Sequence, residues 1–90
     1  AMPVQALQIT NIKGLHARAS AKFAEVVEGF SANATVRKDG LEADGDSIMG
    51  LLMLAAGVGS TIEVETSGTD AEALMSALAT LVANKFGEGD

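Results

Sequence analysis

Hydrophobic and polar residues alternate in several stretches of the chain, with the period of two that is typical of half-buried β-strands. This alternation covers residues 4–10 and residues 60–67. Two shorter alternating runs lie within residues 34–43, on either side of Asp39 and Gly40. An Asp-Gly pair is typical of a two-residue hairpin turn, because both turn positions need a positive φ. The pattern therefore predicts four strands, of which the second and third form a hairpin.

Apolar residues recur at helical spacing in three other stretches, which predicts three helices. The first helix is amphipathic, and the second is apolar nearly all round. The third carries an apolar stripe formed by Leu74, Leu78, Leu81 and Val82. The first helix covers residues 17–29 and starts at His16. The second covers residues 48–55, with a cap at Ser47 or Asp46. The third covers residues 70–86, with a capping box at Thr69 and Glu72 and an end at Gly87.

The predicted order β-α-β-β-α-β-α makes the fold class α+β, with an antiparallel sheet covered on one face by helices. Ninety residues are enough for one small domain and too few for two, so residues 1–90 are expected to form a single domain. The pattern alone leaves the strand order open, either ferredoxin-like or another order of the same elements. Ala1, which precedes Met2, is interpreted as a residue left over from expression and is set aside.

The composition argues against several kinds of site. The chain has no cysteine, so it has no disulfide and no cysteine nucleophile, and its single histidine argues against a zinc site. We therefore expect no metal and no cofactor. A chain without cysteine suits a reducing cytoplasm. The longest apolar run, residues 48–58, is far shorter than the roughly 20 residues that span a bilayer. No signal peptide is recognised either, so membrane insertion is not expected.

Positive charge is concentrated around the single histidine. The net charge is −6, yet Lys13, Arg18 and Lys22 lie within ten positions around His16. From Asp39 onward there are ten acidic residues and one lysine. The overall negative field and the lack of aromatic residues among the cations argue against nucleic-acid binding. A single phosphoryl group or an acidic partner surface suits this local patch.

His16 has the chemistry of a phosphoryl acceptor. A neutral imidazole has one ring nitrogen with a lone pair that can attack phosphorus. At a helix start, free backbone N–H groups and the helix dipole stabilise a phosphoryl group on the ring. Arg18 adds a planar charged fork, and the small Ala17 leaves the ring open to large partners. The ordinary alternative is a solvated surface histidine or a helix cap.

The segments "GLHARAS" and "GDSIMGLLMLAA" resemble those of the HPr family, the histidine-containing phosphocarriers of the bacterial phosphotransferase system. The resemblance covers nearly the whole chain. It implies that phospho-Enzyme I phosphorylates His16 on Nδ1 and that the phosphoryl group passes to a histidine of an enzyme IIA domain. It also implies a sheet of order 1-4-2-3 under three helices, with Arg18 as the active-site arginine. Ala17, Arg18 and Lys13 are the residues expected to cradle the phosphate.

Two positions depart from the family pattern. Ala19 stands where the family usually has proline after the arginine, so the first helical turn gains a backbone N–H. Lys13 stands where the best-known members have asparagine, so a hydrogen-bond acceptor is replaced by a positive charge. Neither change removes the nucleophile, but both bear on the fine geometry and on the match to partners.

The second helix carries two further predictions. Ser47 is favoured as its N-cap, and the resemblance implies regulatory phosphorylation of this serine by HPr kinase/phosphorylase. The helix has more apolar residues than its buried side needs. It is either fully buried or presents an apolar patch, and the resemblance favours a patch that contacts partners. The residues expected to contact partners are Ile48, Met49, Leu52 and Met53. Because this apolar area then has another use, we expect a monomer.

The sequence thus favours a phosphocarrier rather than an enzyme, because it offers no general base, metal site or substrate pocket. One alternative within the family is a nitrogen-regulatory HPr whose phosphorylation state acts as a signal. A regulatory domain that binds a small anion without covalent chemistry is a second. A protein-interaction module that needs Met49 and Met53 but not His16 is a third.

Overall fold

The computed structural model describes residues 2–89, and Ala1, set aside above, lies outside them. Four strands, three α-helices and one 3-10 turn lie within these residues. In order they are β1 (Val4–Gln8), α1 (Ala17–Glu28), β2 (Asn33–Lys38), β3 (Leu41–Asp44), α2 (Ile48–Met53), β4 (Thr61–Ser67), α3 (Ala71–Ala83) and the 3-10 turn η1 (Lys85–Gly87). The predicted element order is therefore confirmed.

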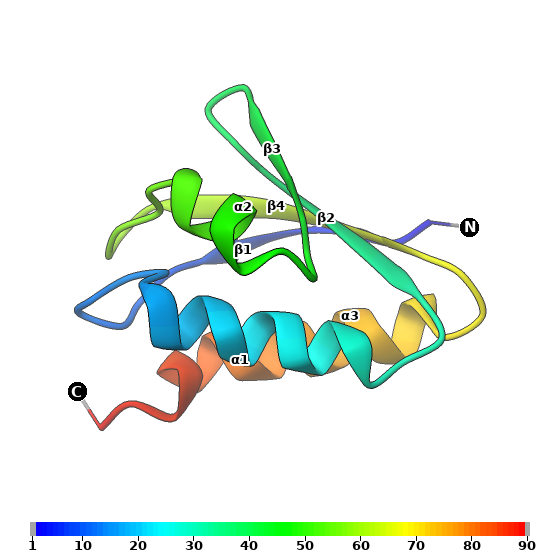
Figure 1. Cartoon of the computed structure of the whole chain (residues 1–90). Helices are drawn as coiled ribbons and strands as arrows, with labels where there is room; N and C mark the ends of the chain where they lie inside the picture. The colour runs from blue at the N-terminus through cyan, green and yellow to red at the C-terminus, as the bar shows by residue number, and fades with distance from the viewer. Residues whose placement is uncertain (1, 90) are drawn as a thin grey trace.

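The four strands form one antiparallel sheet of order β1-β4-β2-β3, and the helices cover one of its faces (Figure 1). This is the α+β arrangement and the strand order that the family resemblance implied. The predicted hairpin is also present. Lys38 pairs with Leu41, and the two turn residues between them have φ values of 51° at Asp39 and 82° at Gly40.

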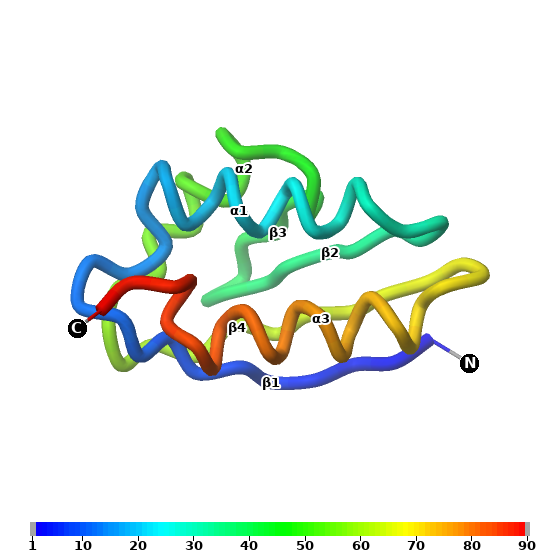
Figure 2. The backbone as a smooth tube through the Cα atoms, turned by 90° about the horizontal axis from the view of Figure 1, so that it is seen from below, coloured from blue at the N-terminus to red at the C-terminus, as the bar shows by residue number. Residues whose placement is uncertain are grey.

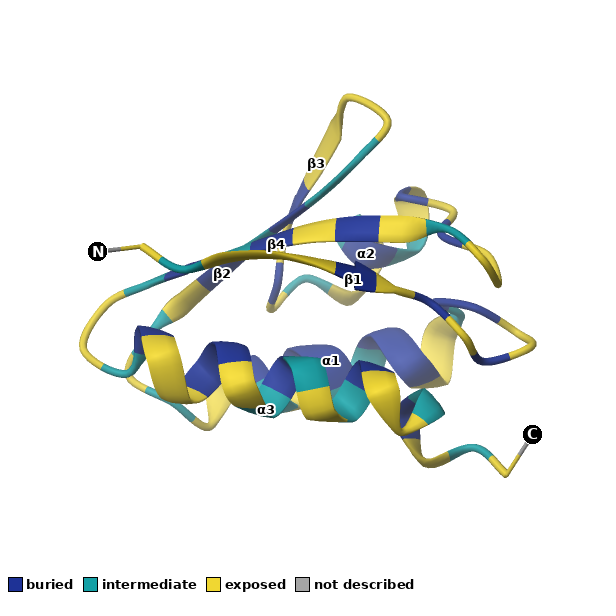
Figure 3. Ribbon diagram, turned by 180° about the vertical axis from the view of Figure 1, so that it is seen from behind, coloured by how far each residue is buried: buried dark blue, intermediate teal, exposed yellow. Residues whose placement is uncertain are grey.

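The core lies between the sheet and the helices, because the buried faces of α1 and α3 both point at the strands (Figure 3). Phe23 of α1 and Leu74 and Leu78 of α3 are fully buried in one core cluster with Ile62 and Val64 of β4. Fully burying one such apolar side chain stabilises the fold by about 1.5 to 3 kcal/mol. The predicted stripe on α3 is confirmed for Leu74, Leu78 and Val82, whereas Leu81 is only partly buried.

Helices α1 and α3 lie side by side and run in opposite directions (Figure 2). They have 12 and 13 residues, so each is about 18 to 20 Å long. Because their lengths match, the end of α3 lies level with the start of α1. The segment that follows α3 therefore passes beside the loop that precedes α1, as the red and blue parts of the tube show. This placement builds the site described below.

Some helix boundaries differ from the prediction. The capping box at Thr69 and Glu72 is wrong: Asp70 is the N-cap of α3, and its carboxylate accepts a hydrogen bond from the Ser31 backbone N–H at 2.8 Å instead of capping the helix. The last helix ends at Ala83 rather than near Gly87, because the chain turns into the left-handed region just beyond it. For the same reason α2 ends at Met53 rather than near Ala55, whose φ is 52°.

Within residues 2–89, no helix has the length and apolar character that a bilayer crossing needs. Over the same residues, the side chains of His, Cys, Asp and Glu form no group of three that could hold a metal ion.

Gly14 and Gly40 provide a matched test of packing, because both have positive φ, at +67° and +82°. A Cβ on Gly14 would lie 2.5 Å from the Ala56 carbonyl oxygen, whereas one on Gly40 meets nothing within 4 Å. We expect Gly40→Ala to lower the free energy of unfolding by about 1 to 2 kcal/mol, the cost of the left-handed conformation. Gly14→Ala should cost at least about 3 kcal/mol, because overpacking adds to that cost. Urea denaturation measures both, and equal losses would contradict the role of Gly14 in close packing.

Candidate functional site

The loop before α1 is fixed by backbone hydrogen bonds to buried groups. The Leu15 N–H donates to the Ala56 carbonyl oxygen at 2.8 Å, and the Leu15 side chain is buried. The hydroxyl of Ser20, itself fully buried, donates to the Leu15 carbonyl oxygen at 3.1 Å. Gly14 allows the close approach to the segment at Ala56 that this arrangement needs. The backbone next to His16 is thus held on both sides.

His16 is the N-cap residue of α1, as predicted, but its side chain does not cap the helix. Its backbone is extended, with φ −77° and ψ −176°, and its carbonyl oxygen accepts the first helical hydrogen bond, from the Ser20 N–H at 2.8 Å. The N–H groups of the first helical turn therefore have no partner within the helix. The imidazole is 25% exposed, so it is partly covered by the protein and still accessible to a partner.

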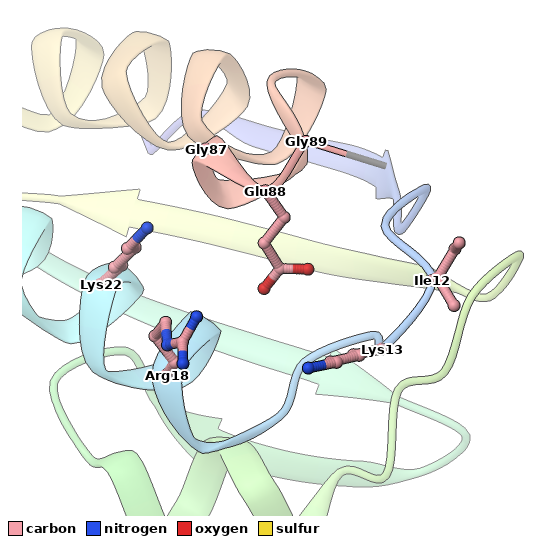
Figure 4. A pocket seen from close by; sticks show the side chains of 7 residues that line it. All are labelled: Ile12, Lys13, Arg18, Lys22, Gly87, Glu88 and Gly89. Atoms are coloured by element: carbon pink, nitrogen blue, oxygen red, sulfur yellow. The ribbon is translucent and has the colours of Figure 1, made fainter.

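A shallow cleft next to the start of α1 is lined by three cations, together with Ile12, Glu88 and two glycines (Figure 4). Arg18 and Lys22 extend into it from α1, and Lys13 extends from the preceding loop. Arg18 and Lys13 are exposed, whereas the Lys22 ammonium donates a 2.7 Å hydrogen bond to the Phe86 carbonyl oxygen. The cationic cluster predicted from the sequence is therefore present on one side of the cleft.

The opposite side of the cleft carries an acidic residue, Glu88, that the sequence analysis did not identify. Its carboxylate points at the cations in Figure 4. One carboxylate oxygen contacts His16 Nε2, and the other accepts a 3.0 Å hydrogen bond from the Asn11 side chain. Asn11 is fully buried and also donates to the Gly14 carbonyl oxygen at 2.7 Å. No local pattern in the sequence signals this contact, because Glu88 lies 72 positions from His16.

A strained turn brings Glu88 to this position. Lys85 and Phe86 both have positive φ, at 57° and 56°, which is rare for residues with side chains. Each costs roughly 1 to 2 kcal/mol relative to a right-handed conformation. The Phe86 ring is fully buried in the core, and that burial offsets the cost. The carbonyl of Phe86 is tied to Lys22, so the turn is held from both sides.

Helix α2 packs against α1 (Figure 2). It also carries the predicted apolar patch. Ile48, Met49 and Met53 are 42%, 68% and 73% exposed, whereas Leu52 is half-buried. The alternative of a fully buried helix is therefore wrong. Ser47 is the N-cap, as predicted, because its hydroxyl accepts a 3.0 Å hydrogen bond from the Gly50 N–H.

The sequence matches known protein families over most of its length. The family model described as "PTS HPr component phosphorylation site" matches residues 4–84. The chain is 49% identical over 82 residues to the phosphocarrier protein HPr of Cupriavidus necator, covering 91% of this chain and 92% of that protein. It is 40% identical over 85 residues to the phosphocarrier protein NPr of Escherichia coli, covering 93% of this chain and 94% of that one.

The fold is similar to that of solved structures as well. The crystal structure of HPr-C-His from Thermoanaerobacter tengcongensis superposes with a TM-score of 0.93 at 34% identity. The superposition covers 98% of this chain and 99% of that one, so the likeness extends over all the elements described above.

Proposed function

The chain belongs to the HPr family of phosphocarrier proteins, and on that premise we propose that it accepts a phosphoryl group from phospho-Enzyme I on His16 and passes it to a histidine of an enzyme IIA domain. The observation that carries the proposal is the position of His16, half-buried at the start of a 12-residue helix and next to a cation-lined cleft. Phosphorylation on a histidine needs this combination of a fixed ring and anion-stabilising groups.

Several neighbouring groups stabilise the phosphoryl group, each by a different interaction. The free N–H groups of Ala17 and Arg18 lie at the positive end of the α1 dipole, which stabilises an anion by about 0.3 to 1 kcal/mol at an exposed site. The Arg18 guanidinium offers two parallel donors to phosphate oxygens. Lys13 adds a positive charge at the position where the family resemblance implies asparagine. Ala19 is buried, so its backbone N–H, rather than its side chain, is what it adds to this turn.

Partner proteins are proposed to dock on the apolar patch of α2, formed by Ile48, Met49, Leu52 and Met53. Exposed methionines suit a surface that binds several partners in turn, because their side chains adapt to different shapes. A partner that covers α2 also reaches His16, since α2 packs against α1. Docking and phosphoryl transfer then involve one continuous surface.

A second candidate is a nitrogen-regulatory carrier, in which the phosphorylation state of His16 is the signal. The similarity to Escherichia coli NPr favours this branch, whereas the similarity to Cupriavidus necator HPr favours the first. The two candidates use the same residue and differ in the partner. Comparing transfer rates from Enzyme I of a sugar system and from its nitrogen-system counterpart separates them, because the cognate donor reacts faster at equal concentration.

Removing the imidazole tests the carrier role directly. We expect one acid-labile phosphate on the wild-type protein after incubation with Enzyme I and phosphoenolpyruvate, and none on His16→Ala. Intact-mass analysis before and after brief acid treatment measures it. The imidazole is not part of the hydrophobic core and does not cap α1, so His16→Ala should retain the thermal unfolding midpoint of the wild type.

Measurements of anion binding and of partner binding on the same variants distinguish the remaining alternatives. Saturable anion binding that survives His16→Ala, with no phosphate on the wild type, would support a non-covalent anion-binding domain. Partner binding that needs α2 but neither His16 nor Arg18 would support an interaction module. The Enzyme I preparation is first shown to be active on a known acceptor.

The α2 patch is tested by shortening its most exposed side chains. We expect Met49→Ala combined with Met53→Ala to weaken Enzyme I binding about tenfold or more, the loss of about 1.4 kcal/mol that a central contact typically carries. Val4→Ala is the matched control, because Val4 is also an exposed apolar residue (51%) but lies on β1. Titration calorimetry measures the affinities, and equal loss in the control would contradict the assignment.

Ser47 is proposed as a site of regulatory phosphorylation by HPr kinase/phosphorylase, and Ser47→Asp mimics its charge. Aspartate caps a helix as well as serine does, so we expect the unfolding midpoint to change little. Enzyme I affinity should fall several-fold, because a negative charge then lies beside the apolar patch. Ser76→Asp on the exposed side of α3 is the control for net charge. Unchanged affinity in Ser47→Asp would count against this regulatory role.

A further inference from the structure

The carboxylate of Glu88 bridges two side chains that lie far from it in the sequence. Its two oxygens contact His16 Nε2 and Asn11 Nδ2, so it is held at both ends. An ionised carboxylate only accepts hydrogen bonds, so the shared proton belongs to Nε2 of the ring. In a neutral imidazole the lone pair is then on Nδ1. The contact therefore selects which nitrogen of His16 reacts.

We infer that Glu88, held by Asn11, is a positioning residue for phosphoryl transfer at His16: it keeps the proton on Nε2, orients Nδ1 for attack, and stabilises the positive charge that the ring gains. The inference rests on the proposed phosphocarrier function and deepens it. The aspartate of a Ser-His-Asp triad plays a comparable part, because it fixes the tautomer of the histidine and stabilises the imidazolium without itself taking the proton.

The transfer step balances with the proton left in place. The Nδ1 lone pair forms the nitrogen–phosphorus bond, and the bond between phosphorus and the donor nitrogen breaks with its electron pair going to the donor. The His16 ring, which keeps its Nε2 proton, becomes a phosphorylated imidazolium beside the Glu88 carboxylate. When the phosphoryl group moves on, the nitrogen–phosphorus bond breaks and the ring leaves as neutral imidazole. A ring without that proton would have to leave as an anion, which is a far poorer leaving group.

A buried asparagine and a strained turn hold this carboxylate in position. Asn11 is fully buried, and its Oδ1 has no hydrogen-bond partner within residues 2–89, so the side chain is oriented by its two donated bonds alone. The left-handed turn at Lys85 and Phe86 adds strain that the buried Phe86 ring offsets. Strain of this kind persists only where surrounding contacts over-determine it, and it concentrates at functional sites.

The carboxylate also repels an incoming phosphoryl group, and the positive charges of the neighbouring cations offset this repulsion. Lys13, Arg18 and Lys22 line the same cleft as Glu88. Three positive charges against one carboxylate leave the cleft attractive to an anion. The carboxylate is half-buried, with 15% of its side chain exposed, and it contacts Nε2 rather than Nδ1. Its charge therefore acts most strongly on the ring and less on the phosphoryl oxygens.

The test compares Glu88→Ala, Glu88→Gln and the wild-type chain, with Glu28→Ala as a control that removes an exposed carboxylate at the other end of α1. The first readout is the proton NMR spectrum of 15N-labelled protein at a pH of about 8.5, where an ordinary imidazole is neutral. We expect a slowly exchanging Nε2–H resonance of His16 in the wild type and in Glu28→Ala. Glu88→Gln should retain it through its amide oxygen, and Glu88→Ala should lose it.

The second readout is the rate of phosphoryl transfer to and from His16 at saturating partner. We expect Glu88→Ala to be about tenfold slower in both directions, at the low end of what a hydrogen bond to a charged group contributes, because the pair is partly exposed. Glu88→Gln should fall between it and the wild type, since it orients the ring without the charge. Binding affinity should stay unchanged, because Glu88 lies outside the α2 patch. Glu88→Gln should keep the unfolding midpoint, whereas Glu88→Ala should lower it modestly, because the buried Asn11 amide loses one acceptor.

Retention of the Nε2–H resonance in Glu88→Ala, or transfer at the wild-type rate, would overturn the inference. A loss of rate that Glu28→Ala shares would do the same, since it would reflect net charge alone. These results leave the carrier function intact, because His16 still takes phosphate. A wild-type chain that takes no phosphate from any Enzyme I would instead refute the proposed function and, with it, the inference.

Discussion

The burial of α1 and α3 against one face of the sheet is the constraint on which the rest of the structure depends. Phe23, Leu74 and Leu78 are fully buried there, and each contributes about 1.5 to 3 kcal/mol. Because both apolar faces must cover the same strands, the helices lie side by side. Short connections link α1 to β2 and β4 to α3, and since β2 and β4 are antiparallel, the two helices are antiparallel as well. The start of α1 and the end of α3 therefore coincide in space. A chemical site forms at that point without any element dedicated to it.

The electrostatics of the site run against those of the molecule. The chain carries a net charge of −6, yet Lys13, Arg18 and Lys22 lie together beside His16. An acidic surface repels polyanions, whereas a local cluster of cations attracts a small anion. Glu88 is acidic like most charged residues of the chain, but its contacts with Asn11 and His16 place it beside these cations. A field built this way favours a small anion over a long one.

Local patterns predicted the elements of the fold, whereas the finer contacts of the site depend on tertiary structure. The Asp39-Gly40 hairpin, the cap at Ser47 and the helix start at His16 each follow from a few neighbouring residues, so the sequence predicts them well. Asp70 bonds to Ser31, 39 positions away, which a local capping rule cannot include. Glu88 lies 72 positions from His16, and only the packing of α1 on α3 brings them together.

His16 must satisfy two demands that oppose each other. A ring that is fully exposed loses orientation, and a ring that is fully buried cannot meet a protein partner. The structure answers by fixing the backbone through Leu15 and Ser20, which are buried, and leaving the imidazole a quarter exposed. Contact with Glu88 then restrains the remaining rotation of the ring. Because this contact engages Nε2, it leaves Nδ1 as the ring nitrogen that Glu88 does not bind.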